Sequence, residues 1–515
     1  MNRSRRTALM VVALLAVLGW RWYSGQHRQP AGNAAATAPA VLRKFGQLTF
    51  VPCTLAPEFG VQTVEAQCSS LDVPENRATP GGRKIKLAIA WVPARREAEP
   101  DPIFMLAGGP GQSALESFPG IAPAFDEARK HRDVILVDQR GTGGSNPLLC
   151  HDKPAAAMAS GAAVNADADE DPGATRAFAE SCLKEVSTHA DVRFYSTTEA
   201  IQDLDDVRRA LGVDKTNLIG VSYGTRVAQQ YAKRYPAHTR TATLDGVVPN
   251  SLVLGNEFAG NLEDSLDRQF ARCSQDKLCV GKLGDPRARL TSLLAMLKSS
   301  PPRVHYRDAI TGEAREEPLT AGHVAVLARM FAYAPQAATL LPLVLNEAAQ
   351  GRYEPLMALS HLLATTLGKE ITQGMQLSVI CTEDASELKA NPADANSLLG
   401  NALVDSLLAQ CPAWPHGTRP PDFRAPLSGP VPVLLMSGEF DPVTPPRYAD
   451  AVAKTLPNSR QLVVRGQGHN VLPVGCMPRL FAHFLDQADA KSLDASCLKT
   501  VPYSPPFTGF YGWEP

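Results

Sequence analysis

The sequence has almost no net charge, and this near absence excludes some classes of protein. Its 515 residues include 51 Lys and Arg against 52 Asp and Glu, a formal charge of −1 at pH 7. Proteins that bind nucleic acid through their overall charge are strongly basic, so this class is excluded. Apolar residues make up 44% and charged residues 20%, which is typical of a globular protein with a large core.

Long hydrophobic runs are also missing, which excludes a polytopic membrane protein. Thr7–Trp20 is a stretch of 14 uncharged residues that follows the three arginines of Met1–Arg6. As a helix it would span about 21 Å, less than a bilayer core of about 30 Å. We therefore expect residues 1–24 to be a signal peptide and 25–44 a flexible linker. An uncleaved membrane anchor is the alternative, because Arg21-Trp22-Tyr23 stands where small residues usually precede a cleavage site.

No C-x-x-C pair and no zinc-ligand spacing occur among the ten cysteines, so no metal site is expected from them. The cysteines fall into five neighbouring couples, separated by 15, 32, 6, 30 and 21 positions. In an oxidising compartment such couples predict local disulfides, and reduced buried thiols are the alternative. The predicted pairs are Cys53–Cys68, Cys150–Cys182, Cys273–Cys279, Cys381–Cys411 and Cys476–Cys497.

Short apolar segments that alternate with helical patterns predict a mostly parallel sheet covered on both faces. The expected strands are 84–92, 103–106, 133–137, 217–220, 240–244, 431–436 and 461–464, and the expected helices are 197–211, 225–235 and 478–486.

One long stretch, 250–429, interrupts this rhythm and is too long for a loop. Within it, 319–367 is rich in Ala and Leu with a helical period. The sequence therefore predicts an α/β core, 45–249 and 430–515, split by an inserted, mainly helical cap domain.

Gly220-Val221-Ser222-Tyr223-Gly224 matches the pattern G-x-S-x-G. This pattern is weak by itself, but here it follows a predicted strand and opens a helix, which is the setting of a nucleophile elbow. A strained turn of this kind lifts the serine hydroxyl clear of the carboxyl edge of the sheet. We expect Ser222 to be a catalytic nucleophile.

Asp441 and His469 are the expected partners of Ser222. A serine hydroxyl needs a base to take its proton, and in this arrangement the acid and base follow in the order Ser, Asp or Glu, His. Each of the two residues follows a predicted strand, so both fall at the same edge of the sheet. Glu439 is the rival acid, and His483, inside the last predicted helix, is the other histidine that follows.

An oxyanion needs two backbone N–H donors that are already in place. The expected donors are Tyr223, next after the nucleophile, and the turn Gly108-Gly109-Pro110-Gly111. Gly108 and Gly109 allow the backbone to approach the substrate closely. No G-K-[ST] follows this turn, so it is not a phosphate loop, and we expect no nucleotide or other cofactor.

Several motifs together carry a family resemblance: GGPGQS at 108–113, DQRGTGGS at 138–145, GVSYG at 220–224, and GEFDPVTP at 438–445 with GQGH at 466–469. The chain resembles the secreted type of the proline iminopeptidase and tripeptidyl aminopeptidase branch of the α/β-hydrolases. The cysteine layout near both ends extends this resemblance. One departure is Ala107, because many relatives have His before GGPG.

The resemblance implies a serine exopeptidase that releases single residues or tripeptides from the free N-terminus of peptides. Such an enzyme must bind an ammonium group, and carboxylates of the inserted domain are the expected means. The candidates are Glu383 and Asp384, which follow a cysteine, and Glu257. For each of them, a solvated surface carboxylate is the alternative.

The N-terminal segment and the cysteines predict an exported protein, periplasmic or secreted, that meets a membrane only through an uncleaved anchor. We expect peptide substrates, no nucleic-acid partner and a monomer. Two other functions stay open: an exported carboxylesterase or lipase that uses the same triad, and a binding protein on an inactive hydrolase scaffold.

Overall fold

The computed structural model describes residues 42–57, 60, 62–150 and 172–512, and Arg43–Pro515 form one compact unit. The predicted signal segment 1–24 and nearly all of the linker 25–44 lie outside the described residues. Within the described part of the chain, every helix is too short or too polar to cross a bilayer.

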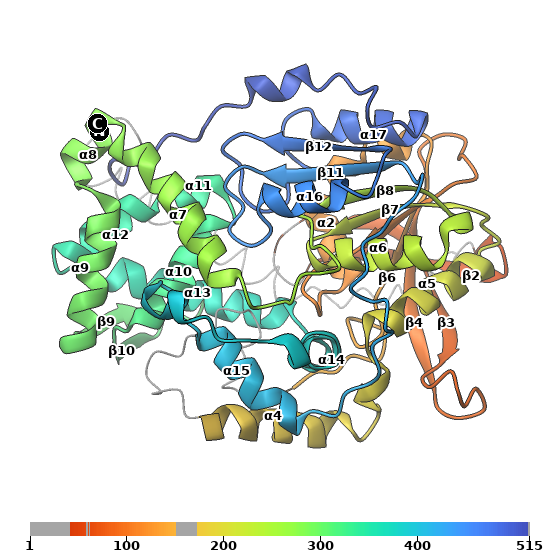
Figure 1. Cartoon of the computed structure of the whole chain (residues 1–515), viewed down its shortest axis with the longest axis horizontal. Helices are drawn as coiled ribbons and strands as arrows, with labels where there is room; N and C mark the ends of the chain where they lie inside the picture. Colours follow the sequence, from red (N-terminus) through yellow and green to blue (C-terminus); the bar gives the residue numbers. More distant parts are fainter. Residues whose placement is uncertain (1–41, 58–59, 61, 151–171, 513–515) are drawn as a thin grey trace, which may run out of the picture. The chain divides into compact units, whose positions relative to one another are not determined.

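A sheet of ten strands forms the core, in the order β1-β2-β3-β4-β6-β5-β7-β8-β11-β12. The strands are β1 (Arg43–Phe45), β2 (Leu48–Leu55), β3 (Val64–Pro74), β4 (Lys84–Val92), β5 (Ile103–Leu106), β6 (Val134–Val137), β7 (Thr216–Val221), β8 (Thr239–Asp245), β11 (Val433–Gly438) and β12 (Ser459–Val464). From β6 to β12 all neighbours are parallel, whereas β1 to β4 and the β4–β6 pair are antiparallel. All seven predicted strands are present, and β1–β3 are additional to the prediction. Figure 1 labels β4, β6, β7, β8, β11 and β12 among them.

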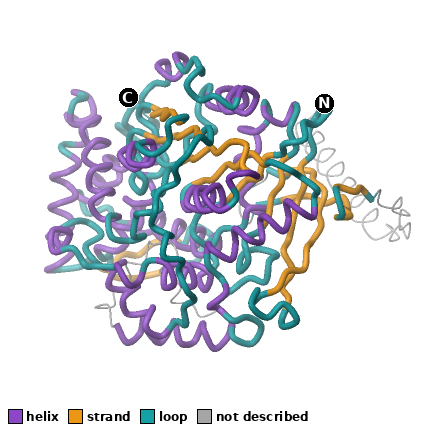
Figure 2. Tube along the Cα trace, turned by 45° about the vertical axis from the view of Figure 1, so that its right-hand side comes forward, coloured by secondary structure: helices purple, strands orange, loops and turns teal. Residues whose placement is uncertain are grey.

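Helices cover both faces of this sheet, and its central strands are accordingly buried on both sides. Strands β5 and β6 are fully buried, and their alternate residues enter two separate hydrophobic clusters. One cluster includes side chains of α4 (Pro172–Val186), α5 (Thr197–Ala210), α6 (Tyr223–Arg234) and α16 (Pro446–Ala453), and the other includes side chains of α2 (Ala114–Ile121) and α17 (Met477–Gln487). Figure 2 shows helices beside the strands. The predicted α/β architecture is confirmed.

Between β8 and β11 the chain forms the segment that we call the cap, residues 250–429. Its elements are α7 (Phe258–Ser274), α8 (Lys277–Leu283), α9 (Pro286–Ser299), β9 (Arg303–Arg307), β10 (Ala314–Pro318), α10 (Ala321–Ala332), α11 (Pro335–Ala338), α12 (Leu341–Ala349), α13 (Glu354–Glu370), α14 (Gln373–Glu383) and α15 (Ala402–Gln410). Helices α7, α9, α10, α12 and α13 share a hydrophobic cluster of their own. Helices α14 and α15 instead contribute Met375, Ile380 and Leu407 to a cluster of the sheet. The helical content agrees with the sequence, and the β9–β10 hairpin is an addition.

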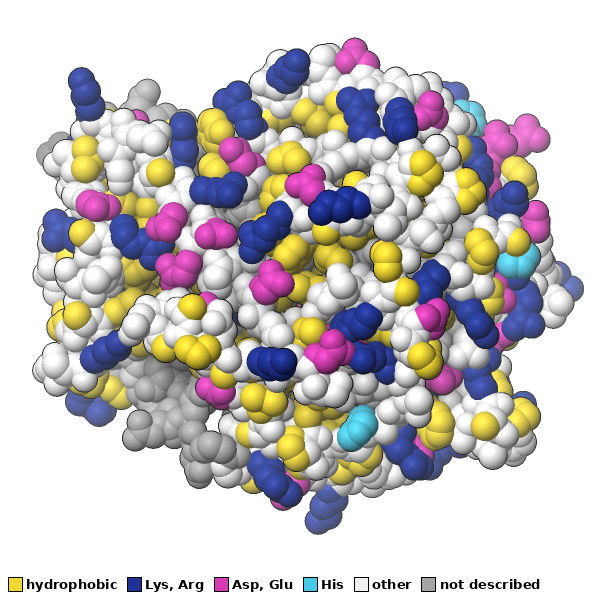
Figure 3. Space-filling model, viewed as in Figure 1, with side chains coloured by type: hydrophobic (Ala, Val, Ile, Leu, Met, Phe, Trp, Pro, Cys, Tyr) yellow, Lys and Arg dark blue, Asp and Glu magenta, His cyan; other side chains and the backbone are white. Residues whose placement is uncertain are grey.

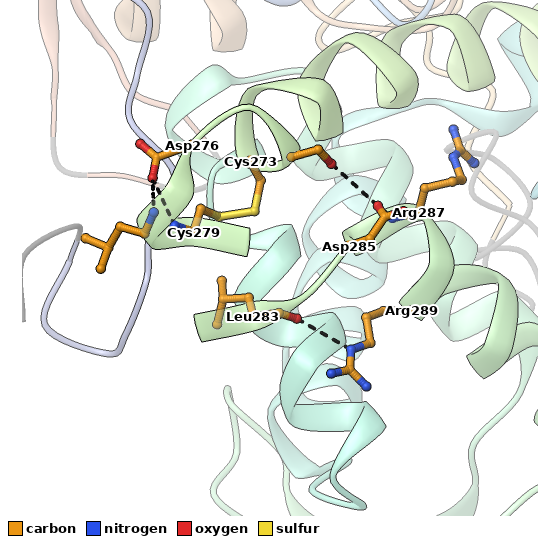
Figure 4. Close-up of a disulfide and its surroundings, with 9 residues drawn as sticks. Cys273, Asp276, Cys279, Leu283, Asp285, Arg287 and Arg289 are labelled. Atoms are coloured by element: carbon orange, nitrogen blue, oxygen red, sulfur yellow. Dashed lines mark hydrogen bonds between the residues drawn. A yellow bond between two sulfur atoms is a disulfide. The ribbon is translucent and has the colours of Figure 1, made fainter. Parts of the chain in front are cut away.

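Five disulfides join the ten cysteines in the predicted pairs, and no cysteine is free. Figure 4 shows the pair Cys273–Cys279, which ties the end of α7 to α8. Between them, the carboxylate of Asp276 accepts hydrogen bonds of 2.9 Å from the backbone N–H groups of Leu278 and Cys279 and so caps α8. Five disulfides are typical of an extracellular or periplasmic protein.

Charged side chains of both signs are interspersed on the face shown in Figure 3. This mixture matches the formal charge of −1.

Candidate active site

Ser222 lies in a sharp turn between β7 and α6. Its backbone has φ 56° and ψ −124°, a conformation that costs free energy for a residue with a side chain. The flanking glycines make this turn possible, because a Cβ on Gly220 would lie 2.2 Å from the carbonyl oxygen of Gly224, and one on Gly224 would lie 2.2 Å from that of Leu106. The backbone N–H of Ser222 donates to the carbonyl of Asp245, at 2.8 Å, which ties the turn to β8.

Asp441 and His469 meet where β11 and β12 end. The two strands are parallel neighbours, so their following loops emerge at one edge. Nδ1 of His469 lies 2.8 Å from Oδ2 of Asp441, and the two side chains are 4% and 0% exposed. The carboxylate is further fixed by the backbone N–H groups of Val443, at 2.9 Å, and Thr444, at 2.8 Å. The Thr444 hydroxyl donates to the same Oδ2, at 2.8 Å, and lies 3.1 Å from Nδ1.

The buried pair perturbs both pKa values. Burial alone would lower the pKa of His469, but the charge of Asp441 and their hydrogen bond raise it above its ordinary value. Burial also acts to raise the pKa of Asp441, and the neighbouring His469 lowers it below its ordinary value. The aspartate therefore favours the imidazolium, as a partner of a general base must.

Ser222 and His469 line one cavity of about 230 Å³. Core residues and cap residues share its wall. The residues that line it are Gly109, Pro110, Gln112, Phe178, Ser222, Leu254, Gly255, Phe258, Arg329, Met330, Tyr333, Glu370, Ile371, Gln373, Gln376, Leu377, Ile380, Leu403, Ser406, Leu407, Gln410, Val443, His469 and Asn470.

The glycine turn after β5 lies against the nucleophile. A Cβ on Gly108 would approach Cβ of Ser222 to 3.1 Å, and Gly109 has φ 105°, a value that favours glycine. Gly109 and Ser222 line the same cavity. Tyr223 opens α6, and the first N–H groups of a helix have no acceptor within the helix. The structure thus brings the three predicted oxyanion residues next to Ser222.

The DQRG motif, residues 138–141, supports the glycine turn after β5 and the start of α6. Asp138 is buried, and its Oδ1 accepts from the Ser113 hydroxyl, at 2.7 Å, and from the Leu115 N–H, at 3.0 Å. Its other oxygen accepts from the Gly144 N–H, at 2.9 Å. Next along the chain, the Gln139 amide donates to the hydroxyl of Tyr223, at 3.3 Å. The motif therefore connects the glycine turn with the helix that begins after the nucleophile.

Comparison with known proteins agrees with the fold described above. Residues 101–475 match the family described as alpha/beta hydrolase fold. The chain belongs to the α/β-hydrolase fold family. Serine protease Hip1 of Mycobacterium tuberculosis is 25% identical over 95% of this chain and 96% of its own length. Tripeptidyl aminopeptidase of Streptomyces lividans is 32% identical over 35% of each chain. Among solved structures, proline iminopeptidase of Mycobacterium smegmatis covers 82% of this chain and 100% of its own at 16% identity, with a TM-score of 0.40.

The rival residues of this α/β-hydrolase lie elsewhere. Glu439 accepts hydrogen bonds from the Gly466 N–H, at 2.7 Å, and from the Tyr503 hydroxyl, at 3.3 Å. His483 is exposed on α17. Oδ2 of Asp441 lies 2.8 Å from Nδ1 of His469, so Asp441 is the acid that the structure pairs with this histidine.

Two of the predicted amine-binding acids are buried in an ion-pair network outside the cavity, contrary to the expectation. Glu383 is 1% exposed and accepts from the backbone N–H of Thr197, at 2.6 Å. Asp384 is fully buried and accepts from Nη1 of Arg226, at 3.0 Å, and from Arg424, at 2.8 Å. Burial raises the pKa of Glu383 to about 7. Both carboxyl groups are occupied by buried protein partners, and neither lines the cavity.

Glu257 precedes α7 and accepts a hydrogen bond from the Tyr448 hydroxyl, at 2.7 Å. It does not line the cavity either, although its neighbours Gly255 and Phe258 do. Among the described residues that line the cavity, the one carboxylate is Glu370, at the end of α13. Sequence reasoning missed Glu370 because no motif surrounds it.

Proposed function

We propose that this protein is an exported serine peptidase that removes residues from the free N-terminus of peptides. The observation that carries the proposal is a cavity under the cap whose wall includes Ser222, His469 and one carboxylate, Glu370. The 25% identity to serine protease Hip1 over 95% of this chain supports the peptidase activity. The 32% identity to tripeptidyl aminopeptidase over 35% of the chain supports attack at the N-terminus.

In the proposed reaction, Oγ of Ser222 attacks the scissile carbonyl carbon while His469 takes the hydroxyl proton. Asp441 holds the imidazole in place and stabilises the imidazolium. The backbone N–H groups of Tyr223 and of the turn at Gly108 and Gly109 donate to the oxyanion. His469 then gives its proton to the leaving amine as the C–N bond breaks. Water, activated by the same histidine, hydrolyses the acyl-enzyme and releases the N-terminal fragment.

The proposed selectivity for a free N-terminus comes from Glu370. The acyl part of the substrate occupies the cavity, so its terminal ammonium ends inside a space of about 230 Å³. Typical small-molecule pockets are larger, roughly 300–1,000 Å³, so only a short acyl part fits. Partial desolvation raises the pKa of Glu370, although the residue as a whole is exposed, and an ammonium beside it would stabilise the charged form.

The test compares each aminoacyl or tripeptidyl arylamide with its N-acetylated form. A charge-assisted hydrogen bond contributes about 1.5–3 kcal/mol, so kcat/KM should be about 10- to 150-fold higher for the free amine. Glu370→Gln should remove most of this preference. Glu354→Gln is the matched control, because Glu354 is also exposed but lies at the other end of the same helix and does not line the cavity.

Equal rates on free and acetylated peptides would contradict the aminopeptidase. Hydrolysis of short acyl esters of p-nitrophenol without hydrolysis of any arylamide would favour the carboxylesterase instead. A preference that survives Glu370→Gln would contradict the residue assignment alone.

A further inference from the structure

Two histidines and a glutamate from separate parts of the cap converge away from the active site. Glu317 lies on β10, His323 in the first turn of α10 and His361 in the middle of α13. One possible ligand atom of each lies within 4.8 Å of those of the other two. Figure 1 shows these elements side by side, and α13 packs against both α10 and β9. The short segment between Glu317 and His323 and the long one to His361 match no familiar ligand spacing, so the sequence alone gives no signal.

Neighbouring groups hold the glutamate and one histidine in place. Oε2 of Glu317 lies 3.1 Å from Nε2 of His361, while Oε1 accepts a hydrogen bond of 2.6 Å from the hydroxyl of Tyr306. The Tyr306 ring also stacks on the His361 ring, with centroids 5.1 Å apart and planes 20° from parallel. One tyrosine of β9 thus fixes both the carboxylate and the imidazole.

The third side chain has a fixed orientation as well. Nδ1 of His323 lies 2.8 Å from the hydroxyl oxygen of Thr320 and 3.2 Å from the Thr320 backbone nitrogen. The ring centroid of His323 lies 5.4 Å from that of His361. The Thr320 backbone N–H donates to Nδ1, which places the proton of the neutral imidazole on Nε2. To bind an ion through Nε2, the ring must take the other tautomer, in which Nδ1–H donates to the Thr320 hydroxyl, the arrangement usual for metal-binding histidines.

We propose that Glu317, His323 and His361 form a binding site for a divalent transition metal, best matched by Zn²⁺. Two imidazole nitrogens and a carboxylate oxygen are a common ligand set of zinc, with water in the fourth position. Bonds of roughly 2.0–2.2 Å in a tetrahedron put ligand atoms about 3.3–3.5 Å apart, and the 3.1 Å between Glu317 and His361 is already close to this. The side chains of His361 and Glu317 are 23% and 30% exposed, so an ion can enter from solvent.

A metal ion at this site would stabilise the cap and would take no part in the proposed reaction. The opposite ends of its two helices reach the active-site cavity, at Met330 of α10 and Glu370 of α13. At about 1.5 Å per residue, these positions lie roughly 10 and 14 Å along the helices from His323 and His361. A bound ion would therefore cross-link β10, α10 and α13 and so fix the part of the cap that lines the cavity.

The experiment uses the untagged, exported form of the chain, dialysed against a chelator and titrated with Co²⁺ and then with Zn²⁺. We expect one equivalent of Co²⁺ per chain with the intense visible absorption of four-coordinate cobalt, and its displacement by one equivalent of Zn²⁺. All ten cysteines are in disulfides, so thiol ligands do not contribute. Absence of stoichiometric binding would overturn the proposal and leave a hydrogen-bonded His–Glu cluster.

Single substitutions test which residues bind the metal ion. His361→Gln and His323→Gln should each abolish stoichiometric binding, and Tyr306→Phe, which keeps the ring but loses the hydroxyl, should weaken it about 10- to 100-fold. His305→Gln is the matched control, because His305 lies on the same hairpin, has an 80% exposed side chain and sits 3.6 Å from Glu316. Unchanged binding by both His361→Gln and His323→Gln, with native circular dichroism, would overturn the assignment.

Discussion

The backbone N–H of His469 donates a hydrogen bond of 2.8 Å to the carbonyl oxygen of Tyr333, the C-cap residue that follows α10. The loop that carries the proposed catalytic base is thus attached directly to the cap. Tyr333 also stands edge-on to the His469 ring, with centroids 5.2 Å apart. The cap therefore helps to position the base in addition to forming the wall of the cavity.

Gly468 makes this close approach possible, and its replacement should separate the His469 loop from the cap at Tyr333. In Gly468→Ala the new Cβ would lie 2.2 Å from the carbonyl oxygen of Tyr333, so either the histidine loop or the end of α10 must shift. We expect kcat/KM to fall at least about 10-fold and stability to fall by about 1–3 kcal/mol. Gly281→Ala is the control: a Cβ there meets nothing within 4 Å in α8, so this change should be neutral or slightly stabilising. Full activity of Gly468→Ala would show that the contact with Tyr333 does not matter for the base.

Ser222→Ala should abolish turnover and preserve the fold. The residues of a triad act as a unit, and loss of the nucleophile typically lowers kcat by about 10⁴- to 10⁶-fold. Labelling by a fluorophosphonate probe should disappear, while the circular dichroism spectrum stays native. Ser406→Ala serves as the control, since Ser406 lines the same cavity from α15. Hydrolysis by pure Ser222→Ala at the wild-type rate would disprove the assignment of the nucleophile.

Activity should fall on the acidic side as His469 becomes protonated. The pKa of His469 is raised above its ordinary value of 6.5 by Asp441, and only the neutral imidazole can accept the serine proton. The acid limb of kcat/KM should therefore have its midpoint above 6.5. Asp441→Asn should move this limb to lower pH and reduce kcat by about 10⁴-fold. Asp450→Asn, an exposed site on α16, should do neither, and an unmoved acid limb in Asp441→Asn would contradict the pairing.

The parts of the fold that the sequence predicts are those with a local signal. Strands such as β5 and β6 are short apolar runs buried on both faces, and Ser222 and Asp441 follow strands that are almost fully buried as well, β7 and β11. His469 follows β12, an edge strand that is only partly buried. Strands β2 and β3 escaped prediction because their burial alternates imperfectly and much of their length is half-exposed. Their pairing depends on the neighbouring strand β4, which no short window of sequence reveals.

The predicted amine-binding acids depend on contacts that have no local signal in the sequence. Glu383 and Asp384 stand out in the sequence because they follow Cys381, yet their environment is set by Arg226, more than 150 positions earlier and 0% exposed. Glu370 lies in the cavity only because α13 ends there. Contacts between segments far apart in the sequence therefore determine both the burial of Glu383 and Asp384 and the position of Glu370 at the cavity.

The last prediction is that the two buried acids, Glu383 and Asp384, contribute differently to stability. Asp384→Asn should destabilise the protein by about 3–5 kcal/mol, because Arg226 would keep its buried charge after losing its closest carboxylate, at 3.0 Å. Glu383→Gln should be mild, since an amide oxygen can still accept from the Thr197 N–H and the ion pair that it loses is longer, at 3.7 Å.

The pH dependence of these variants gives a sharper readout. The pKa of Glu383 is about 7 in the folded protein against an ordinary value of 4.5, so the folded state binds this proton more tightly than the unfolded state. The stability that this proton contributes is present below about pH 4.5 and is lost as the pH rises through 7. Denaturant unfolding should therefore show Glu383→Gln gaining stability relative to the wild type from pH 5 to pH 8, whereas the deficit of Asp384→Asn should persist throughout. A stability difference for Glu383→Gln that does not change with pH would contradict the raised pKa. A fully stable Asp384→Asn would show that Glu383 and the carbonyl of Leu252 suffice to hold the buried charge of Arg226.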